Sequence, residues 1–488
     1  MKVFDFSIFS KKLKNFDPYL IIIFIFIVLY IFFFTSFSFM QYFSFNPGNE
    51  LCVLHRHIFL MSQGRIFNGI LEYEKGFGAA HFYMVFWVLL PAYFVFPNPL
   101  TLLFLQTSFL AIGAIPIYLL ARDKLNSKLA GIILAVCYLL YPALQNINLF
   151  EFHAVALAVP FLLWSFYFME KNDMKKSLVF IVLSMMCKET VALAVILMGF
   201  YALIKNKNEK LGMTIIFLGS FWAFFSLFVM FPYTYDGRPY FNAWAWRWGH
   251  IGETAPDVAV NFIKDPIYPL AYDLPAKVEY LIALFSPLGF LSLLSPGTML
   301  IVIHELILHL SSGKYPMYYL NHYTAVLIPF IFISAILGIR FIQSKIRIKP
   351  IFYLILFFIL VTSIISNLSF SKEPITSYGE RLNQIINFEI SDHDMLLLKI
   401  IDTIPKNSTL AVDVRLCPQS SNIKKVYFLH DYVENSEGMY KNVTVDFILF
   451  DNTKKSFDTE VEDRLSEILS KEFVIYNNTD EIFLYKHV

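Results

Sequence analysis

The stretch YLIIIFIFIVLYIFFFTSFSFM, residues 19–40, contains no charged side chain in 22 consecutive positions. A helix of about 20 apolar residues matches the ~30 Å hydrocarbon core of a bilayer. The run is too long for the apolar segment of a cleavable signal peptide, and no small-residue cleavage site follows it. We therefore expect residues 19–40 to stay in the protein as a membrane anchor.

The rest of the chain also has the composition of a protein that resides in lipid. Of its 488 residues, 57% are hydrophobic and only 16% are charged, whereas a soluble domain has about 25% charged residues. The apolar residues are concentrated before residue 370. We therefore predict an all-α polytopic membrane domain over residues 1–369 and a small soluble α/β domain over residues 370–488. The formal net charge of +1 gives no reason to expect nucleic acid as a partner.

Twelve apolar segments are candidates for membrane crossings, several of them shorter than the ~20 residues of a perpendicular span. They cover residues 18–40, 81–96, 99–121, 129–149, 154–169, 177–187, 190–204, 211–232, 278–294, 298–311, 322–339 and 350–368. Short loops rich in Lys and Arg stay in the cytoplasm. Five basic clusters should share that side: Lys2/Lys11/Lys12/Lys14, Arg122/Lys124/Lys128, Lys171/Lys175/Lys176, Lys205/Lys207/Lys210 and Arg340/Lys345/Arg347/Lys349.

The number of crossings must agree with that sidedness. If all the candidates span, the N-terminus and the Arg122 turn fall on opposite sides of the membrane. The best candidate to remove is 81–96, which is short and is interrupted by Pro91, and we interpret it as an in-plane or re-entrant helix at the outer surface. About eleven crossings remain, in a cell-membrane protein with a cytoplasmic N-terminus. Loops 41–98 and 233–277 and the C-terminal domain are then extracytoplasmic.

The tail shows the alternation of a small α/β domain. Strand-like runs cover residues 408–414, 425–429, 445–451, 473–478 and 481–486, and a helix is expected near 459–470. No Gly-rich phosphate loop precedes that helix, which argues against nucleotide binding. Asn-x-Ser/Thr sequons occur only at Asn367, Asn407, Asn442 and Asn477, which favours an extracytoplasmic tail.

The four cysteines, Cys52, Cys137, Cys187 and Cys417, are scattered and form no CxxC pair. Neither a zinc site nor a disulfide framework can be read from such a spacing. We therefore expect unpaired thiols.

Ionisable residues in tight turns between apolar spans are costly, so each is a functional hypothesis. Glu151 and His153 share one such turn, where a carboxylate beside an imidazole suits a general base or the binding of a divalent cation. Lys188 and Glu189 share another, where the ammonium could pair with a phosphate. The alternatives are a solvated turn for the first pair and a snorkelling lysine for the second.

His304-Glu305 and His309 superficially resemble a zinc-protease HExxH motif but are spaced one residue too far apart. Positions i and i+5 lie about 140° apart on a helix, so these histidines should not share a zinc ion. Glu305 remains a candidate on its own. The two long loops carry further polar residues, including His55, Arg56 and His57 in the first and Arg247 and His250 in the second. Together the loops could line a cavity at the outer membrane surface.

Several of these segments resemble the domain-of-unknown-function 2079 family of membrane proteins. The segments that match well are His81-Phe82, 99–106, 116–122, 138–144, 148–153 and 187–189, and weaker echoes are 249–252, 286–289, Glu305 and His322-Tyr323. The likeness covers residues 40–370 and is poor in the tail. The family in turn resembles the C-type glycosyltransferases. That resemblance implies transfer of a sugar from a polyprenyl-phosphate donor at the extracytoplasmic face, with an acidic residue of the first outer loop as base.

This chain departs from the family pattern in that loop. Asn46 stands where the family has its acidic residue, and Ala80 stands where an Asp usually precedes His-Phe. Asn cannot accept a proton as a general base at pH 7. Activity of this kind therefore requires Glu50, Glu72 or Glu74 as a substitute.

We therefore predict a membrane glycosyltransferase-like protein that moves a sugar from a polyprenyl-phosphate donor to an extracytoplasmic lipid or protein acceptor. Its partners are membrane lipid and the lipid-linked sugar. The catalytic candidates are Glu50, Glu151 and His153. The substrate-binding candidates are Asn46, His81, Lys188, Glu189, Arg247, Glu305 and His322.

Two other functions stay open. The first is a catalytically inactive receptor or scaffold for lipid-linked glycans, which Asn46 and Ala80 favour. The second is a transporter, which is less favoured because the two halves of the sequence show no internal repeat.

Overall fold

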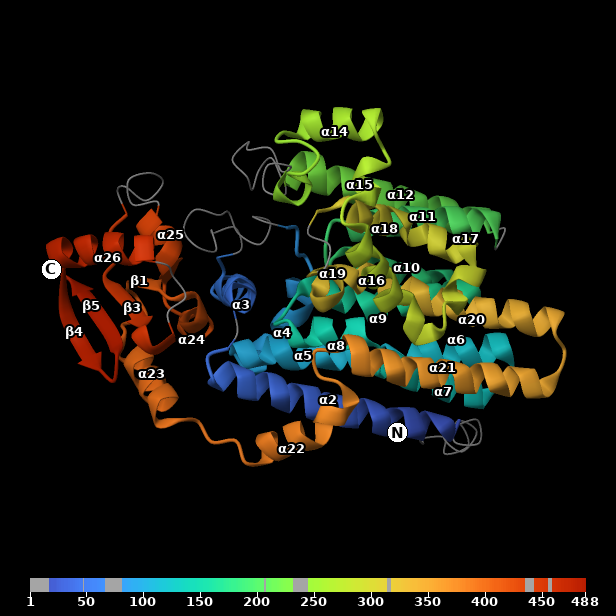
Figure 1. Ribbon diagram of the computed structural model, residues 1–488, viewed down its shortest axis with the longest axis horizontal. Coiled ribbons are helices and arrows are strands. Elements are labelled where there is room, and N and C mark those ends of the chain that lie inside the picture. Colours follow the sequence, from blue (N-terminus) through green and yellow to red (C-terminus); the bar gives the residue numbers. More distant parts are fainter. Residues whose placement is uncertain are drawn as a thin grey trace, which may run out of the picture.

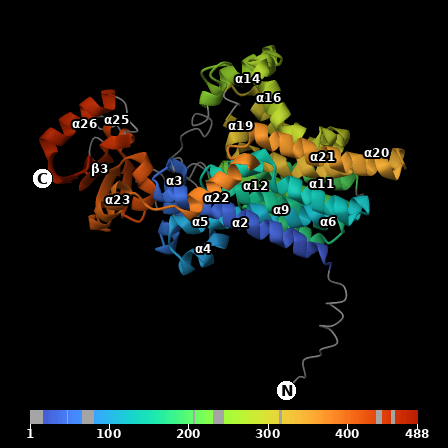
Figure 2. The ribbon, with the colours of Figure 1, turned by 60° about the horizontal axis from the view of Figure 1, so that its bottom comes forward.

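A bundle of apolar helices forms one side of the molecule and a small sheet with its own helices forms the other (Figure 1). The computed structural model describes residues 17–46, 48–65, 81–205, 208–230, 245–313, 317–434, 443–454 and 459–488. Helix α3 (Asn49–Ser62) lies between the bundle and the sheet, as a second view also shows (Figure 2).

Five helical segments within the described residues are long and apolar enough to cross a membrane. They are α2 (Tyr19–Phe43), Pro99–Leu125 with α5 (Pro99–Ile112) and α6 (Ala114–Leu125), Glu209–Met230 with α12 (Glu209–Phe225), His322–Lys345 with α20 (Leu327–Lys345), and α21 (Lys349–Phe370). Helices α7 (Lys128–Leu139) and α8 (Pro142–Leu149) make a sixth span if their 41° bend is counted as one crossing. The predicted number of about eleven crossings is not confirmed.

The remaining apolar candidates form shorter helices because prolines, glycines and polar turns interrupt them. Those of the bundle are α4 (Phe86–Val95), α9 (Ala158–Glu170), α10 (Met174–Met185), α11 (Val191–Ile204), α16 (Leu274–Phe285), α17 (Pro296–Met299) and α18 (Ile303–Ser311). Three more short helices are α14 (Ala255–Lys264), α15 (Tyr268–Ala271) and α19 (Met317–Leu320). Helix α4 is about 15 Å long at 1.5 Å per residue, too short to span.

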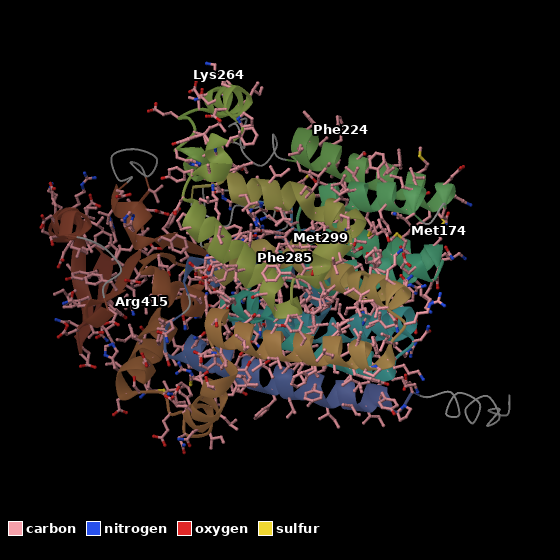
Figure 3. The ribbon with its side chains drawn as sticks, turned by 45° about the vertical axis from the view of Figure 1, so that its right-hand side comes forward. Met174, Phe224, Lys264, Phe285, Met299 and Arg415 are labelled. Atoms are coloured by element: carbon pink, nitrogen blue, oxygen red, sulfur yellow. A yellow bond between two sulfur atoms is a disulfide. The ribbon has the colours of Figure 1, made fainter. Side chains whose placement is uncertain are left out.

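The bundle keeps apolar side chains on its outside, as expected of a lipid-facing surface. Phe224 of α12 is 59% exposed and points away from the bundle (Figure 3). Inside, small residues allow close approach. A Cβ on Gly199 of α11 would lie 3.0 Å from the carbonyl oxygen of Gly212 on α12, so these two helices pack nearly backbone to backbone.

The basic turns meet at one end of the bundle. Arg122 and Lys128 both pair with Asp17, and Lys171 pairs with Asp123 at 2.7 Å. The Arg340 guanidinium donates to the carbonyl oxygen of Lys124. These turns therefore share one end, as the positive-inside argument requires, and the side of the membrane that this end faces stays a prediction.

The sheet has the order β2-β1-β3-β5-β4, in which β1 is parallel to β2 and β3, and β5 is antiparallel to β3 and β4. Its strands are β1 (Thr409–Val412), β2 (Lys425–Phe428), β3 (Phe447–Asp451), β4 (Phe473–Thr479) and β5 (Ile482–His487). The five predicted strands and the helix α26 (Thr459–Glu472) are thus confirmed. Four further helices belong to this part of the chain. Two precede β1, α22 (Tyr378–Ile386) and α23 (Asp392–Thr403), and two lie between β1 and β3, α24 (Cys417–Ser420) and α25 (Leu429–Glu434).

The sheet is covered on both faces. Leu410 and Leu449 pack with Leu397 of α23, and Ile448 on the other face packs with Val461 and Leu465 of α26. Alternate residues of a strand point to opposite faces, so the strands are apolar along most of their length. The boundary between a membrane domain and a soluble domain at residues 369 and 370 stays a prediction.

The structure corrects the expectation of unpaired thiols and excludes one of the sequons as a glycosylation site. Cys52 and Cys417 form a disulfide across a sequence separation of 365, so these two are not unpaired thiols, whereas Cys137 and Cys187 are free and buried. No spacing rule can pair cysteines that only the tertiary fold brings together. Asn367 is fully buried in α21 and donates to Gln145 Oε1, so it has no room for a glycan. Asn442 lies outside the described residues.

Candidate functional site

A cavity of about 180 Å³ lies where several short helices of the bundle meet. Five of the predicted site residues line it. Its lining comprises His81, Val155, Lys188, Thr190, Arg247, Trp248, Glu305, Leu308, His309, His322, Tyr323 and Val326. These residues come from the chain before α4, the turn between α10 and α11, helix α18, and three short 3-10 helices, Ala154–Leu157, Ala245–Trp248 and His322–Val326.

Two cations face this cavity. Within the described residues the Lys188 ammonium makes no hydrogen bond or ion pair. Burial lowers the pKa of Lys188, while the carboxylates of Glu189, Glu305 and Glu50 raise it. The Arg247 guanidinium lies 4.6 Å from the centre of the Tyr323 ring in a cation–π contact. Two cations held this way in a partly enclosed space attract an anion, and a phosphate oxygen matches both donors.

Glu189 is engaged in holding the chain before α4. One of its oxygens lies 2.7 Å from His81 Nδ1, and the other accepts from the Phe82 amide at 3.1 Å. Burial alone would raise the pKa of Glu189, but His81, Lys188 and the hydrogen bonds lower it to about 2. Glu189 is therefore an anion that orients His81 toward the cavity. An acid this strong makes a poor proton acceptor.

Glu151 caps a helix from a distant part of the chain. Its two carboxylate oxygens accept from the amides of Gly48 and Leu51, at 2.8 and 2.7 Å, at the start of α3. Burial raises the pKa of Glu151 to about 7, although these hydrogen bonds act in the opposite direction. Gln106 of α5 fixes the turn by donating to the Glu151 carbonyl and accepting from the His153 amide.

His153 and His322 stack face to face, with ring centres 3.7 Å apart. Glu50 Oε2 lies 3.7 Å from His153 Nε2, and 39% of the Glu50 side chain is exposed. Neither ring nitrogen of His153 has a hydrogen-bond partner within the described residues, nor has Nδ1 of His322. Buried polar atoms without partners are rare in folded proteins, so this stack offers hydrogen-bonding capacity to a ligand.

The structure thus separates the candidates by role. His81, Lys188, Arg247, Glu305 and His322 line the cavity. Glu189 and His153 each contact a lining residue, and Glu50 contacts His153. Glu151 contacts the start of α3, and Asn46 is exposed on the chain that enters this helix. Glu72, Glu74 and Ala80 lie outside the described residues.

Sequence reasoning assigned no place in the site to His309 or Trp248. His309 lies one turn beyond Glu305 on the same face of α18, with its Nε2 3.7 Å from Glu305 Oε2, and its Nδ1 meets the Tyr280 hydroxyl at 2.6 Å. That i, i+4 spacing was visible in the sequence. Trp248 follows Arg247 directly and carried no separate signal.

The Glu151–His153 turn is not arranged as a cation site. The carboxylate faces the start of α3, whereas the imidazole stacks on His322. No group of three or more His, Cys, Asp or Glu side chains in the described ranges is placed to hold a metal ion. A divalent cation stays an untested expectation from the sequence.

Comparison with known proteins identifies the family. A family model described as "predicted membrane protein (DUF2079)" matches residues 50–484, so the chain belongs to this family. The match extends through the sheet, where the sequence likeness had looked poor. A search of curated proteins finds no match.

The fold has solved relatives. ArnT from Cupriavidus metallidurans bound to undecaprenyl phosphate aligns with a TM-score of 0.52 and 10% identity, over 93% of this chain and 97% of that one. The apo state of the same protein aligns with a TM-score of 0.46 and 11% identity, over 94% and 98% of the two chains. The first alignment shows that the chain has an ArnT-like, C-type glycosyltransferase fold, as the resemblance implied.

Proposed function

We propose that this DUF2079 protein binds a polyprenyl-phosphate-linked sugar and transfers the sugar to a lipid or protein acceptor on the extracytoplasmic side. The observation that carries the proposal is the pair of cations, Lys188 and Arg247, at one cavity. The solved relative whose fold it shares is bound to undecaprenyl phosphate. A lipid phosphate supplies the negative charge that this cavity attracts.

The transfer requires one proton acceptor and one stabilised leaving group. The acceptor hydroxyl gives its proton to Glu50 as its oxygen bonds to the anomeric carbon. The bond between that carbon and the phosphate oxygen breaks, and polyprenyl phosphate leaves with the electron pair. Burial raises the pKa of Glu50, while Lys188 lowers it, and a raised pKa improves a carboxylate as a base. Lys188 and Arg247 stabilise the phosphate as its charge develops.

The other candidates act by positioning in this proposal. Glu189 orients His81, and Glu151 holds the start of α3, the helix that carries Glu50. His153 lies between Glu50 and the cavity-lining His322. Glu305 and His309 also line the cavity.

The Cys52–Cys417 disulfide supports the proposed side of the membrane. Structural disulfides persist in oxidising compartments and are rare in the cytosol. The bond joins α3 to the sheet region, so both belong on the extracytoplasmic side. The sequence argument from basic loops leads to the same side independently.

Transfer from radiolabelled undecaprenyl-phosphate sugars by the purified protein tests this proposal. We expect transfer by the wild type, loss of at least 100-fold in Glu50→Gln, and normal transfer in the control Glu253→Gln, an exposed acid of the second long loop. Unchanged transfer in Glu50→Gln would remove Glu50 as the base.

A second candidate function is a receptor that binds the lipid-linked sugar without turnover. Asn46 favours it, since an exposed amide stands where the family has an acid. The wild type would then bind undecaprenyl phosphate, with affinity that depends on Lys188, and would transfer no sugar from any donor offered.

A further inference from the structure

We propose that residues 417–424 of the sheet region position the candidate site by holding α3, and that the Cys52–Cys417 bond makes this placement depend on an oxidising compartment. The link to lipid binding rests on the proposed function, but the placement of α3 does not. The contacts that carry the proposal lie on the face of α3 turned away from the bundle.

The two faces of α3 have different partners. Leu51, Leu54 and Ile58 recur at helical spacing and belong to the apolar core of the bundle. Cys52 belongs instead to the apolar core of the sheet region, together with Phe45, which precedes the helix. Helix α3 is therefore shared by two cores, and the disulfide joins it covalently to the second.

Arg56, one turn beyond Cys52, makes hydrogen bonds to the sheet region. Its side chain is 1% exposed, and its guanidinium donates to the carbonyl oxygens of Ser421, Ile423 and Lys424. The planar guanidinium presents five donors in a fixed geometry, so it can gather several carbonyls of one turn. Burying a charge is costly unless it is well hydrogen-bonded. Moving α3 away from the 421–424 carbonyls would therefore cost free energy, because the Arg56 guanidinium would lose its acceptors.

Two further hydrogen bonds fix the same turn. His55 Nδ1 lies 2.7 Å from Ser421 Oγ, and His55 Nε2 lies 2.8 Å from the Tyr93 hydroxyl oxygen. His55 therefore connects the sheet region to α4. Gln419 donates to the Tyr42 carbonyl at the end of α2. The 417–424 segment thus contacts α3 and α2 directly and is linked to α4 through His55.

The first turn of α3 touches the site directly. Glu151 accepts from the amides of Gly48 and Leu51, and Glu50 lies 3.7 Å from His153 Nε2. His153 in turn stacks on His322 of the cavity. A shift of α3 would change all of these contacts, so the sheet region acts on the site through this helix.

Hydrogen–deuterium exchange of the full-length protein in micelles tests the placement. We expect reductant to raise the exchange rates of peptides covering 49–62 and 150–155 by about tenfold or more, and reoxidation to restore them. The Cys137→Ser/Cys187→Ser variant should respond like the wild type. In the Cys52→Ser/Cys417→Ser variant, both peptides should exchange fast without reductant, and reductant should not change their rates. Equal exchange in oxidised and reduced wild type would overturn the proposal.

A second set of measurements distinguishes positioning of the site from a general loss of stability. Arg56→Met should raise exchange in both peptides, and Arg56→Lys, which can still donate to a carbonyl, should restore part of the protection. If α3 loosens on reduction while the 150–155 peptide stays protected, the positioning role is wrong. Undecaprenyl phosphate should bind at least fivefold more weakly to the reduced wild type. If the oxidised protein does not bind undecaprenyl phosphate either, the proposed function is wrong. The exchange rates would still test the proposal that residues 417–424 position α3.

Discussion

The two ends of the helical bundle treat their charges in opposite ways. At the end where the basic turns meet, cations pair with carboxylates, as Arg122 and Lys128 do with Asp17 and Lys171 does with Asp123. At the end near the sheet, and within the described residues, the Lys188 ammonium makes no hydrogen bond or ion pair, and the buried nitrogens of His153 make no hydrogen bond. The first end pairs its charges, whereas the second, beside the engaged Glu189 and Glu151, keeps an ammonium and an imidazole that make no hydrogen bond within the described residues.

That difference separates a structural role from a functional one. Paired charges near a surface contribute little to stability and need no ligand. Unpaired polar groups that are buried cost free energy, so a fold retains them where a ligand completes them. The charges that we expect to set the sidedness and the charges that we propose to bind the ligand therefore lie at different ends of the bundle.

The largest effect should come from removing Glu189, whose two carboxylate oxygens are both engaged at the site end. Glu189→Gln leaves His81 and Lys188 without their nearest anion. Breaking a buried ion pair costs about 3–5 kcal/mol, which denaturant unfolding in mixed micelles would measure. The exposed Glu209→Gln serves as control. A loss below about 1 kcal/mol would show that Glu189 is solvated like a surface pair.

The second effect is a dependence of stability on pH between about pH 4.5 and 7. The folded-state pKa of Glu151 is about 7, above the ordinary 4.5. A raised carboxyl pKa means that stability is complete below pH 4.5 and declines as pH rises through 7. The loss is on the order of 3 kcal/mol at 1.36 kcal/mol per pH unit. Glu151→Gln should lessen the slope of the stability profile over that range, and an unchanged slope would assign the titration to another group.

A third effect concerns binding. Lys188→Gln removes a charge-assisted contact to the lipid phosphate, which is worth about 1.5–3 kcal/mol, or roughly 10–100-fold in the Kd for undecaprenyl phosphate. Native mass spectrometry or microscale thermophoresis would measure it. Lys175→Gln at the opposite end is the matched control and should bind normally. Equal losses in both variants would mean that the lipid responds only to net charge.

The smallest effect should come from the paired end. Lys171→Gln breaks the contact with Asp123, and the Lys171 side chain is 47% exposed. Exposed pairs contribute about 0–1 kcal/mol, so stability should fall by no more than that and the lipid Kd should stay unchanged. If a denaturant titration showed that the free energy of unfolding falls by several kcal/mol, the proposed difference between the two ends would be wrong.

The sequence predicted what local patterns encode. Strands such as Thr409–Val412 and Phe447–Asp451 emerged from short β-branched and aromatic runs between turn residues. The turns at Glu151 and Lys188 were recognised as costly between apolar segments. The number of crossings is not confirmed, because an apolar run such as Val191–Ile204 has the composition of a span but, at 14 residues, is shorter than a perpendicular span needs to be.

What could not be predicted depends on contacts between distant residues. The Cys52–Cys417 bond and the Arg56 contacts join positions more than 360 residues apart. The role of Glu151 as the cap of α3 joins positions about 100 apart. Because each residue looked like a candidate ligand or thiol by its type alone, only the fold could show which ones hold the scaffold together.

A structure of the protein in lipid nanodiscs with undecaprenyl phosphate would test the central claim most directly. The account predicts the lipid phosphate in the cavity of Lys188 and Arg247, within about 2.7–3.2 Å of their nitrogens, with the isoprenoid chain along the lipid-facing side of the bundle. A phosphate bound at the basic end, beside Arg122 and Lys171, would contradict it.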